Sequence, residues 1–128
     1  MSKRKLHRLG DLQFKIMKVL WDRAEATVAD VHASLAGSAD LAYTTIATML
    51  RKMEARGLVR HRAEGRTFIY RAAVAEDAVA RGMVDDLIDR VFEGSLAEAV
   101  NHLLTTREVS ADELARLERL IAAKKRKL

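Results

Sequence analysis

The chain has 128 residues, the size of one domain or of two small modules. It contains no cysteine, which excludes thiol nucleophiles, iron–sulfur clusters and cysteine-ligated zinc or copper sites. The net charge is +5 but uneven: residues 1–73 hold fourteen Lys/Arg and seven Asp/Glu, and residues 74–128 hold nine and eleven, so the positive field that attracts a polyanion belongs to the first part.

Helices are expected to dominate, because proline is absent and aromatic residues make up only 5% of the chain. Apolar residues at helical spacing predict a first helix over about 11–23, with Asp11 as its N-cap. Thr27, with Asp30 three residues later, predicts the start of a shorter second helix near residue 28. The first part of the chain is therefore expected to begin with two helices.

A third helix is predicted from about Ala42 to Gly57, and its two faces differ. The apolar face consists of Ile46, Met49, Leu50 and Met53. The polar face carries Thr44, Thr45, Thr48 and Lys52. A merely solvated face has little reason to gather β-branched threonines, which are mediocre helix formers. We therefore expect these four residues to read base edges in the major groove of DNA.

Beyond Gly57 the apolar period changes from 3.6 to 2, which predicts a β-hairpin over 58–71 with a tight turn at Glu64-Gly65. The hairpin is rich in arginine, and Arg66 follows directly after that turn. The residues expected to contact the DNA backbone are Arg62, Arg66 and Thr67 of this hairpin, with Tyr43 and Arg51 of the third helix. The alternative is that the basic residues only protect an exposed sheet edge. The aromatic side chains expected in the core are Phe14, Trp21, Phe68 and Tyr70.

Residues 75–128 have the pattern of three amphipathic helices. Gly94 ends the first of them, and Ser110 with Glu113 forms a capping box that opens the last. These helices are too short and too amphipathic to be stable alone, so we expect a second copy of the chain to complete their core. The residues expected in that dimer contact are Met83, Leu87, Ile88, Val91, Phe92, Leu103, Leu117 and Leu120.

The order of elements is that of a mainly α fold with a small β-hairpin, a winged helix-turn-helix at 1–73 followed by a three-helix dimerisation segment at 74–128. The four histidines show no metal-ligand spacing and no catalytic triad is apparent, so we expect no metal, no cofactor and no enzyme activity. No segment approaches 18 uninterrupted apolar residues, which predicts a cytoplasmic protein without membrane insertion. The competing hypothesis is a winged-helix module that binds other proteins and never reads DNA.

Several strings, with this order of elements, resemble the penicillinase/methicillinase repressor family (BlaI/MecI type), and in particular its actinobacterial β-lactamase repressors. The strings are Leu9-Gly10-Asp11-Leu12, Val19-Leu20-Trp21, Asp40-Leu41-Ala42-Tyr43-Thr44-Thr45-Ile46, Gly57-Leu58-Val59, Phe68-Ile69-Tyr70 and Met83-Val84-Asp85. The resemblance implies a homodimeric repressor that binds double-stranded DNA at an inverted-repeat operator with TACA/TGTA-like half-sites. It places the family's groove-facing residues on Thr44, Thr45, Thr48 and Lys52. Thr44 stands where staphylococcal members have lysine, and Lys52 where they have arginine.

The resemblance also implies a sensor-protease system that inactivates the repressor. Staphylococcal members are cleaved at an Asn-Phe bond, and the matching region here reads Asn101-His102-Leu103-Leu104, without that pair. Cleavage near His102 and Leu103 is therefore a hypothesis. Copper-responsive relatives carry a cysteine-rich motif that this chain lacks, so we expect no induction through copper thiolates.

Overall fold

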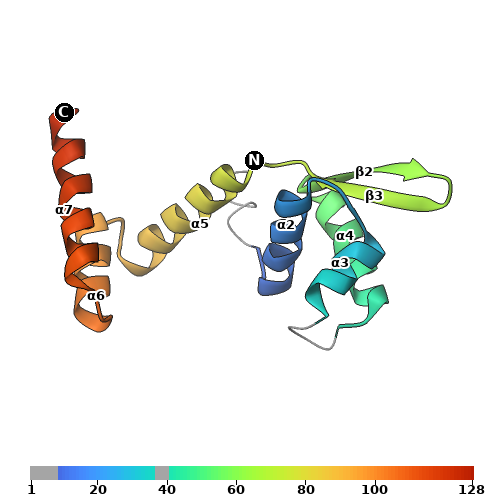
Figure 1. The fold of residues 1–128 in the computed structure, drawn as a ribbon, viewed down its shortest axis with the longest axis horizontal. Helices are drawn as coiled ribbons and strands as arrows, with labels where there is room; N and C mark the ends of the chain where they lie inside the picture. The colour runs from blue at the N-terminus through green and yellow to red at the C-terminus, as the bar shows by residue number, and fades with distance from the viewer. Residues whose placement is uncertain (1–8, 37–40) are drawn as a thin grey trace. The chain divides into compact units, whose positions relative to one another are not determined.

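The computed structural model describes residues 9–36 and 41–128. The described residues form two compact units, one up to Leu87 and one from Ile88 onward. The elements, in chain order, are α2 (Asp11–Arg23), β1 (Ala26–Thr27), α3 (Val28–Leu35), α4 (Tyr43–Ala55), β2 (Val59–Glu64), β3 (Thr67–Ala72), α5 (Glu76–Val91), α6 (Leu96–Thr106) and α7 (Ala111–Arg126) (Figure 1). The predicted fold class, mainly α with a small hairpin, is confirmed. Helix α5 runs across the division between the units, and the domain boundary expected after residue 73 stays a prediction.

The N-cap of the first helix lies one residue earlier than expected. Gly10, in extended conformation at φ −71° and ψ 168°, is the N-cap of α2, and its N–H donates to Oε1 of Gln13 at 3.2 Å. Asp11 is therefore the first helical residue, and the prediction that it caps the helix is wrong. At that position its carboxylate still interacts favourably with the positive end of the helix dipole.

Both ends of the helix pair α3 and α4 follow the expected capping signals. Thr27 Oγ1 accepts a hydrogen bond from the Asp30 N–H at 3.1 Å, and the Asp30 carboxylate accepts one from the Thr27 N–H at 3.0 Å. Gly57, at φ +81°, ends α4 in the left-handed conformation, and its N–H donates to the Glu54 carbonyl at 3.0 Å. The Leu58 N–H donates to the Met53 carbonyl at 3.0 Å, which completes a Schellman motif.

The sheet is antiparallel with strand order β1-β3-β2. In the hairpin, Glu64 pairs with Thr67, so the two-residue turn is Gly65-Arg66 and the expected turn at Glu64-Gly65 is wrong by one position. Gly65 has φ +62°, and the first central position of such a turn needs a positive φ, which places glycine there and Arg66 at the tip. Strand β1 was not expected, because two residues carry no readable period.

The core of the first unit lies between α2, α3, α4 and the sheet, and its buried apolar side chains are Ile16, Met17, Leu20, Ala26, Val31, Leu35, Ile46, Leu50, Met53, Leu58, Val59 and Tyr70. Of the four aromatic residues expected inside, Tyr70 is buried, and Phe14 and Trp21 pack edge to face at the core margin. Phe68 is 45% exposed, so its assignment to the core is wrong. It lies two residues nearer the turn than Tyr70, where the hairpin leaves the core.

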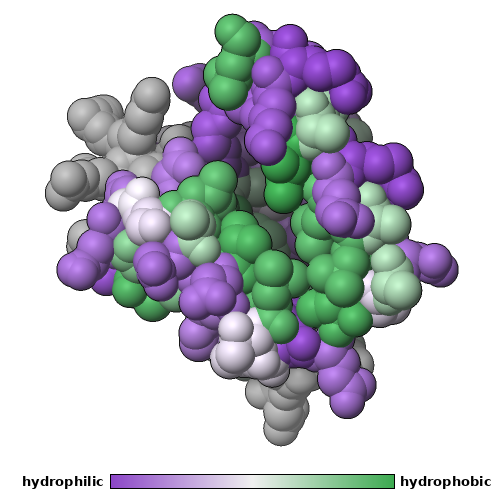
Figure 2. All heavy atoms as spheres, turned by 90° about the vertical axis from the view of Figure 1, so that its left-hand side faces the viewer, coloured by the Kyte–Doolittle hydropathy of each residue, from purple (hydrophilic) through white to green (hydrophobic). Residues whose placement is uncertain are grey.

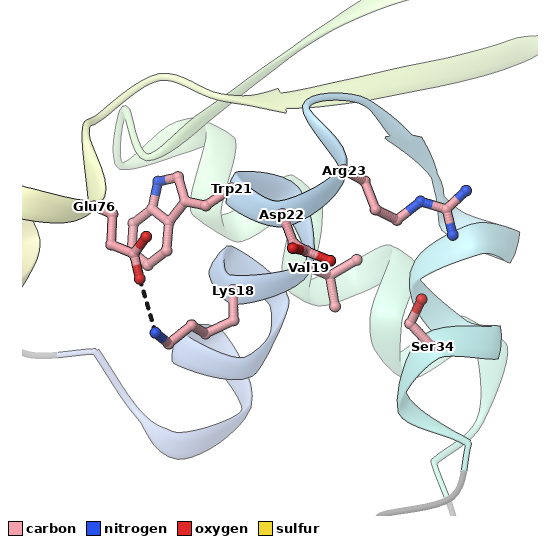
Figure 3. A pocket seen from close by; sticks show the side chains of 7 residues that line it. All are labelled: Lys18, Val19, Trp21, Asp22, Arg23, Ser34 and Glu76. Carbon is pink, nitrogen blue, oxygen red and sulfur yellow. Dashed lines mark hydrogen bonds and ion pairs between the residues drawn. The ribbon is translucent and has the colours of Figure 1, made fainter.

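The beginning of α5 is fastened to α2 within the first unit. The Trp21 indole N–H donates to the Val74 carbonyl at 2.9 Å, and Lys18 Nζ lies 2.7 Å from Glu76 Oε2. Figure 3 shows Lys18, Trp21 and Glu76 together at one side of a pocket of about 480 Å³. Val79, one turn further along α5, is fully buried. Contacts with α2 therefore hold the segment that connects β3 to α5.

The second unit has little interior of its own. Ala99 is the one buried residue among 88–128, all of which the structure describes. Ser95 and Ser110 cap α6 and α7, each accepting a backbone N–H at 3.1 Å, as expected for Ser110. Figure 2 views the molecule from the side of α6 and α7, where hydrophobic side chains gather and hydrophilic ones border them. The apolar residues of a groove of about 490 Å³ here are Val100, Leu104, Leu114, Leu117, Leu120 and Ile121.

Candidate nucleic-acid interface

The exposed face of α4 carries the four residues expected to read bases. Thr44, Thr45, Thr48 and Lys52 are all exposed. Behind them Ile46, Leu50 and Met53 are fully buried, and Met49 is half-buried. The helix is therefore anchored by one face while the other presents hydroxyls, methyl groups and an ammonium. These are the groups that pair with base edges and thymine methyls.

A groove of about 350 Å³ lies between α4, the start of α3 and the hairpin. It brings together four of the residues expected at the DNA backbone, Tyr43 and Arg51 from α4 and Arg66 and Thr67 from the hairpin. The Tyr43 ring is 50% exposed. A guanidinium from the helix and one from the turn thus border one groove with an aromatic ring, an arrangement that suits a sugar–phosphate strand.

Arg51 connects this groove to the exposed face of α4. Its Nη2 lies 3.4 Å from Thr48 Oγ1, a long hydrogen bond between exposed side chains. The remaining lining residues are apolar or uncharged and belong to β1, α3, α4 and β3: Thr27, Val28, Ala29, Ala47, Phe68 and Tyr70. The cations therefore stand at the border of a surface that is otherwise nearly uncharged.

A contact that the sequence did not indicate holds the hairpin against α4. His61 Nδ1 on β2 lies 2.7 and 2.9 Å from the two carboxylate oxygens of Glu54 on α4. The His61 ring also stacks on Phe68, with centroids 4.0 Å apart and planes 18° apart. Phe68 is thus a platform for His61 rather than a core residue. A side-chain contact thus adds to chain connectivity in holding the hairpin beside α4.

Arg62 lies on the other face of the hairpin from His61, because successive residues of a strand alternate between faces. Its Nε and Nη2 donate to the two carboxylate oxygens of Glu25 at 3.2 and 3.1 Å, and its Nη1 donates to Glu64. Hydrogen bonds from Arg62 lower the pKa of Glu25, and both carboxylates raise the pKa of Arg62. The charge of Arg62 is therefore balanced by two carboxylates before any ligand binds. Arg62 does not line the groove that Arg66 and Thr67 border. Its role at DNA stays a prediction.

The residues expected in a dimer contact lie on all three C-terminal helices. Met83, Ile88, Phe92 and Leu117 are partly exposed, and Leu87, Val91, Leu103 and Leu120 are 46 to 59% exposed. Four further apolar residues of the α6–α7 groove lie on the same apolar stripes but were not among those expected in the dimer contact: Val100, Leu104, Leu114 and Ile121. The structure shows this surface, and what covers it stays a prediction.

The region of the expected cleavage lies within α6. His102 and Leu103 are exposed, and the His102 ring centroid is 5.6 Å from that of Phe92. The Thr106 hydroxyl donates to the His102 carbonyl at 2.8 Å, so this peptide is held in a regular helix. Cleavage here stays a prediction.

Residues 9–36 and 41–128 contain no group of three or more His, Cys, Asp or Glu side chains that could hold a metal ion. In the same part of the chain, no helix has both the length and the apolar character needed to span a bilayer.

Comparison with known proteins gives a consistent result. The sequence profile of the penicillinase repressor family matches residues 9–123. The transcriptional regulator BlaI of Mycobacterium tuberculosis is 38% identical over 120 residues, 92% of this chain and 86% of that protein. The penicillinase repressor of Bacillus licheniformis is 25% identical over 118 residues, 92% of each chain.

A solved structure of the DNA-binding domain of the repressor BlaI is similar to the winged-helix part. The TM-score is 0.51 at 27% identity, over 57% of this chain and 89% of that domain. The expected winged-helix fold is thereby confirmed.

Proposed function

We propose, from the premise that the chain belongs to the penicillinase repressor family, that it binds an inverted-repeat operator as a homodimer and blocks a promoter. Family membership makes it a DNA-binding transcriptional repressor and not an enzyme, and it does not favour the alternative of a winged-helix module that never reads DNA. The observation that supports the finer proposal is the exposed threonine and lysine face of α4 beside a groove bordered by two arginines.

In this proposal each side chain has a distinct task at DNA. Thr44, Thr45 and Thr48 contact base edges and thymine methyls in the major groove, and Lys52 reaches a guanine or a phosphate. The wing-tip residue Arg66 and Arg51 of α4 hold a phosphate strand through the groove between them. The first group sets sequence preference and the second sets register and affinity.

A second copy of the chain is the proposed partner of the C-terminal helices. One winged helix reads one half-site, and twofold symmetry of the protein matches an inverted repeat. The apolar side chains left exposed on α5, α6 and α7 supply the surface that such a pair would bury. In the cytoplasm, where the chromosome lies, this dimer would exclude polymerase from genes of the β-lactamase type.

The release step belongs to the same proposal. A sensor-protease that cuts near His102-Leu103 would sever α6 and so separate the paired subunits. Because this bond lies in a hydrogen-bonded helix, α6 must first unwind locally. Recovery of intact protein from β-lactam-induced cells in which repression has ended would contradict this release step.

The test of the proposed function is operator binding by a Lys52→Ala variant. If Lys52 reads a base, the variant loses about 1–3 kcal/mol of operator binding and its sequence preference relaxes at one position. If Lys52 touches phosphate, binding weakens uniformly and the slope of log affinity against log salt falls by about one. Anisotropy titrations with an AT-rich inverted repeat from the protein's own promoter and with a scrambled duplex measure both quantities.

The matched control is Lys125→Ala, which removes the same charge from an exposed position on α7. It should leave sequence preference unchanged. Equal binding of the wild-type protein to operator and scrambled duplex would contradict the proposed function, and unchanged operator binding by Lys52→Ala would contradict the role of that residue.

A further inference from the structure

The carboxylate of Glu25 contacts the β2–β3 hairpin, the wing of this winged helix, where its negative charge repels phosphate. Glu25 lies in the connection between α2 and β1, and both of its oxygens accept hydrogen bonds from Arg62 on β2, at 3.1 and 3.2 Å. The two residues are 37 positions apart in the chain, so tertiary folding brings them together. The planar fork of the guanidinium matches the two oxygens in the bidentate geometry that phosphate oxygens also fit.

The backbone before Glu25 is strained. Ala24 has φ 71° and ψ −51°, and the Glu25 N–H donates to the Arg23 carbonyl at 2.8 Å, which is a γ-turn of the rare form. A residue with a side chain is seldom held in this conformation, and such strain persists only where the surrounding structure enforces it. Here it ends α2 sharply and delivers Glu25 to the edge of the sheet beside β1.

The Glu25–Arg62 pair is not needed to orient the wing. Six residue pairs of β2 and β3 fix the hairpin, two pairs join β1 to β3, and Glu54 binds His61 from α4. The side chains of Arg62 and Glu25 are 51% and 44% exposed, and exposed ion pairs contribute little to stability. The main effect of Glu25 is therefore electrostatic: it holds Nε and Nη2 of a guanidinium whose Nη1 is bound by Glu64, and these two nitrogens would otherwise be open to phosphate.

We propose that Glu25 is a specificity-determining residue that competes with DNA phosphate for Arg62 and so weakens binding to non-operator DNA. The inference rests on the proposed function, in which the wing meets the DNA backbone. On an operator, the base contacts of α4 dock the wing firmly and Arg62 exchanges Glu25 for a phosphate. On other sequences the wing is not docked in this way, and Arg62 stays with Glu25. The lowered pKa of Glu25 agrees with a carboxylate that stays ionised in this role.

The experiment compares Glu25→Gln with the wild-type chain on scrambled and operator duplexes over a series of salt concentrations. Glu25→Gln keeps the shape of the side chain and removes its charge. On scrambled duplex we expect affinity to rise several-fold at low salt and the slope of log affinity against log salt to steepen by about 0.9 per subunit, the value for one more phosphate contact. Operator affinity should rise less, so the ratio of operator to scrambled affinity falls.

Two controls isolate the pair from a general change of charge. Asp22→Asn removes the same charge from an exposed carboxylate on α2, and it should leave the slope nearly unchanged. In an Arg62→Gln background, Glu25→Gln should no longer change the slope, because its effect acts through Arg62. Thermal unfolding by circular dichroism checks that each variant is folded, and Glu25→Ala serves as a second variant.

Two outcomes would overturn the inference. In the first, the slope for Glu25→Gln on scrambled duplex matches that for Asp22→Asn. In the second, Glu25→Gln binds both duplexes more weakly, which would make Glu25 a positioning residue for the wing. The salt slope and the affinity of Glu25→Gln are both measured on scrambled duplex, so the two outcomes can be recognised even if the wild-type chain shows no operator preference. Absence of operator preference in the wild-type chain would contradict the proposed function, whereas the slope on scrambled duplex tests the competition for Arg62 by itself.

Discussion

The two compact units of this chain treat their apolar residues in opposite ways. The unit up to Leu87 surrounds a core in which side chains such as Ile16, Ile46 and Leu50 are fully buried. The unit from Ile88 onward buries only Ala99, and it leaves leucines such as Leu120 more than half exposed. A helix that shows its apolar stripe to solvent is incomplete, whereas a winged helix with a dry core is not. The first unit thus presents a polar surface backed by a dry core, whereas the second leaves an apolar surface exposed.

The largest effect is expected from the core of the first unit. Leu50→Ala should lower the free energy of unfolding by about 2–5 kcal/mol, because it removes a fully buried side chain and leaves a cavity. Chemical denaturation followed by circular dichroism measures this loss. Leu128→Ala, at a position 98% exposed, should change it by less than about 0.5 kcal/mol. Similar small losses for both variants would break the contrast between the two units.

The next effect concerns the surface of the second unit. Leu120→Asp places a charge in the α6–α7 groove and should separate the subunits of the proposed homodimer while the winged helix stays folded. Affinity for a full inverted repeat should fall about 100-fold or more, because the two half-sites are no longer bound by one assembly. Sedimentation velocity and anisotropy measure the two changes.

The control for this variant is Leu128→Asp, which should remain dimeric because Leu128 does not line that groove. A Leu120→Asp chain that sediments as an intact dimer would show that another surface pairs the subunits.

A smaller loss of stability is expected from the N-cap of α3 in the first unit. Thr27→Ala removes the hydroxyl that accepts the Asp30 N–H, and it should lower the free energy of unfolding by about 1 kcal/mol. Thr27→Ser keeps the acceptor and should recover most of the loss. If alanine and serine variants unfold at the same temperature, the capping hydrogen bond contributes nothing measurable.

The smallest effect is the acid dependence of the same capping box. Hydrogen bonds from Thr27 lower the pKa of Asp30 below its ordinary value of 3.8. A carboxylate with a lowered pKa in the folded state stabilises the fold above its ordinary pKa, and this contribution is lost as pH falls through the lowered value. The melting temperature should therefore fall as pH drops below about 3.8, and it should fall less in Asp30→Asn. Parallel pH profiles for the two chains would contradict this assignment.

Most of the fold could be predicted because local signals and the tertiary structure agree. The caps at Thr27 and Ser110 and the glycine at the end of α4 lie where their residue types indicate. The errors have local causes. The N-cap of α2 is Gly10, whose N–H donates to the Gln13 side chain, and not Asp11. The hairpin turn lies one residue later than expected, because the positive φ of Gly65 suits the first central position. Strand β1 exists only through its pairing with β3 and so left no trace in the sequence pattern.

Part of the candidate site could be predicted from local sequence patterns, and part of it depends on contacts between separate elements. The threonine and lysine face of α4 follows from helical period alone, and the structure exposes all four residues. The contacts that hold the hairpin do not follow from any period, because each joins separate elements. Glu25 meets Arg62 across 37 positions, and Glu54 meets His61 from a helix to a strand. Strand alternation could have predicted that Arg62 and His61 lie on opposite faces of the hairpin, but it could not have predicted which acidic residues contact them.

The contact between Glu54 and His61 has a consequence for operators. Because this contact joins the hairpin to α4, the two parts that meet DNA in the proposed function keep a constant separation. A half-site offers the bases for the helix and the phosphates for the wing tip at one set separation along the duplex. Inserting a single base pair between those two places should leave each contact chemically intact and yet make them unattainable together.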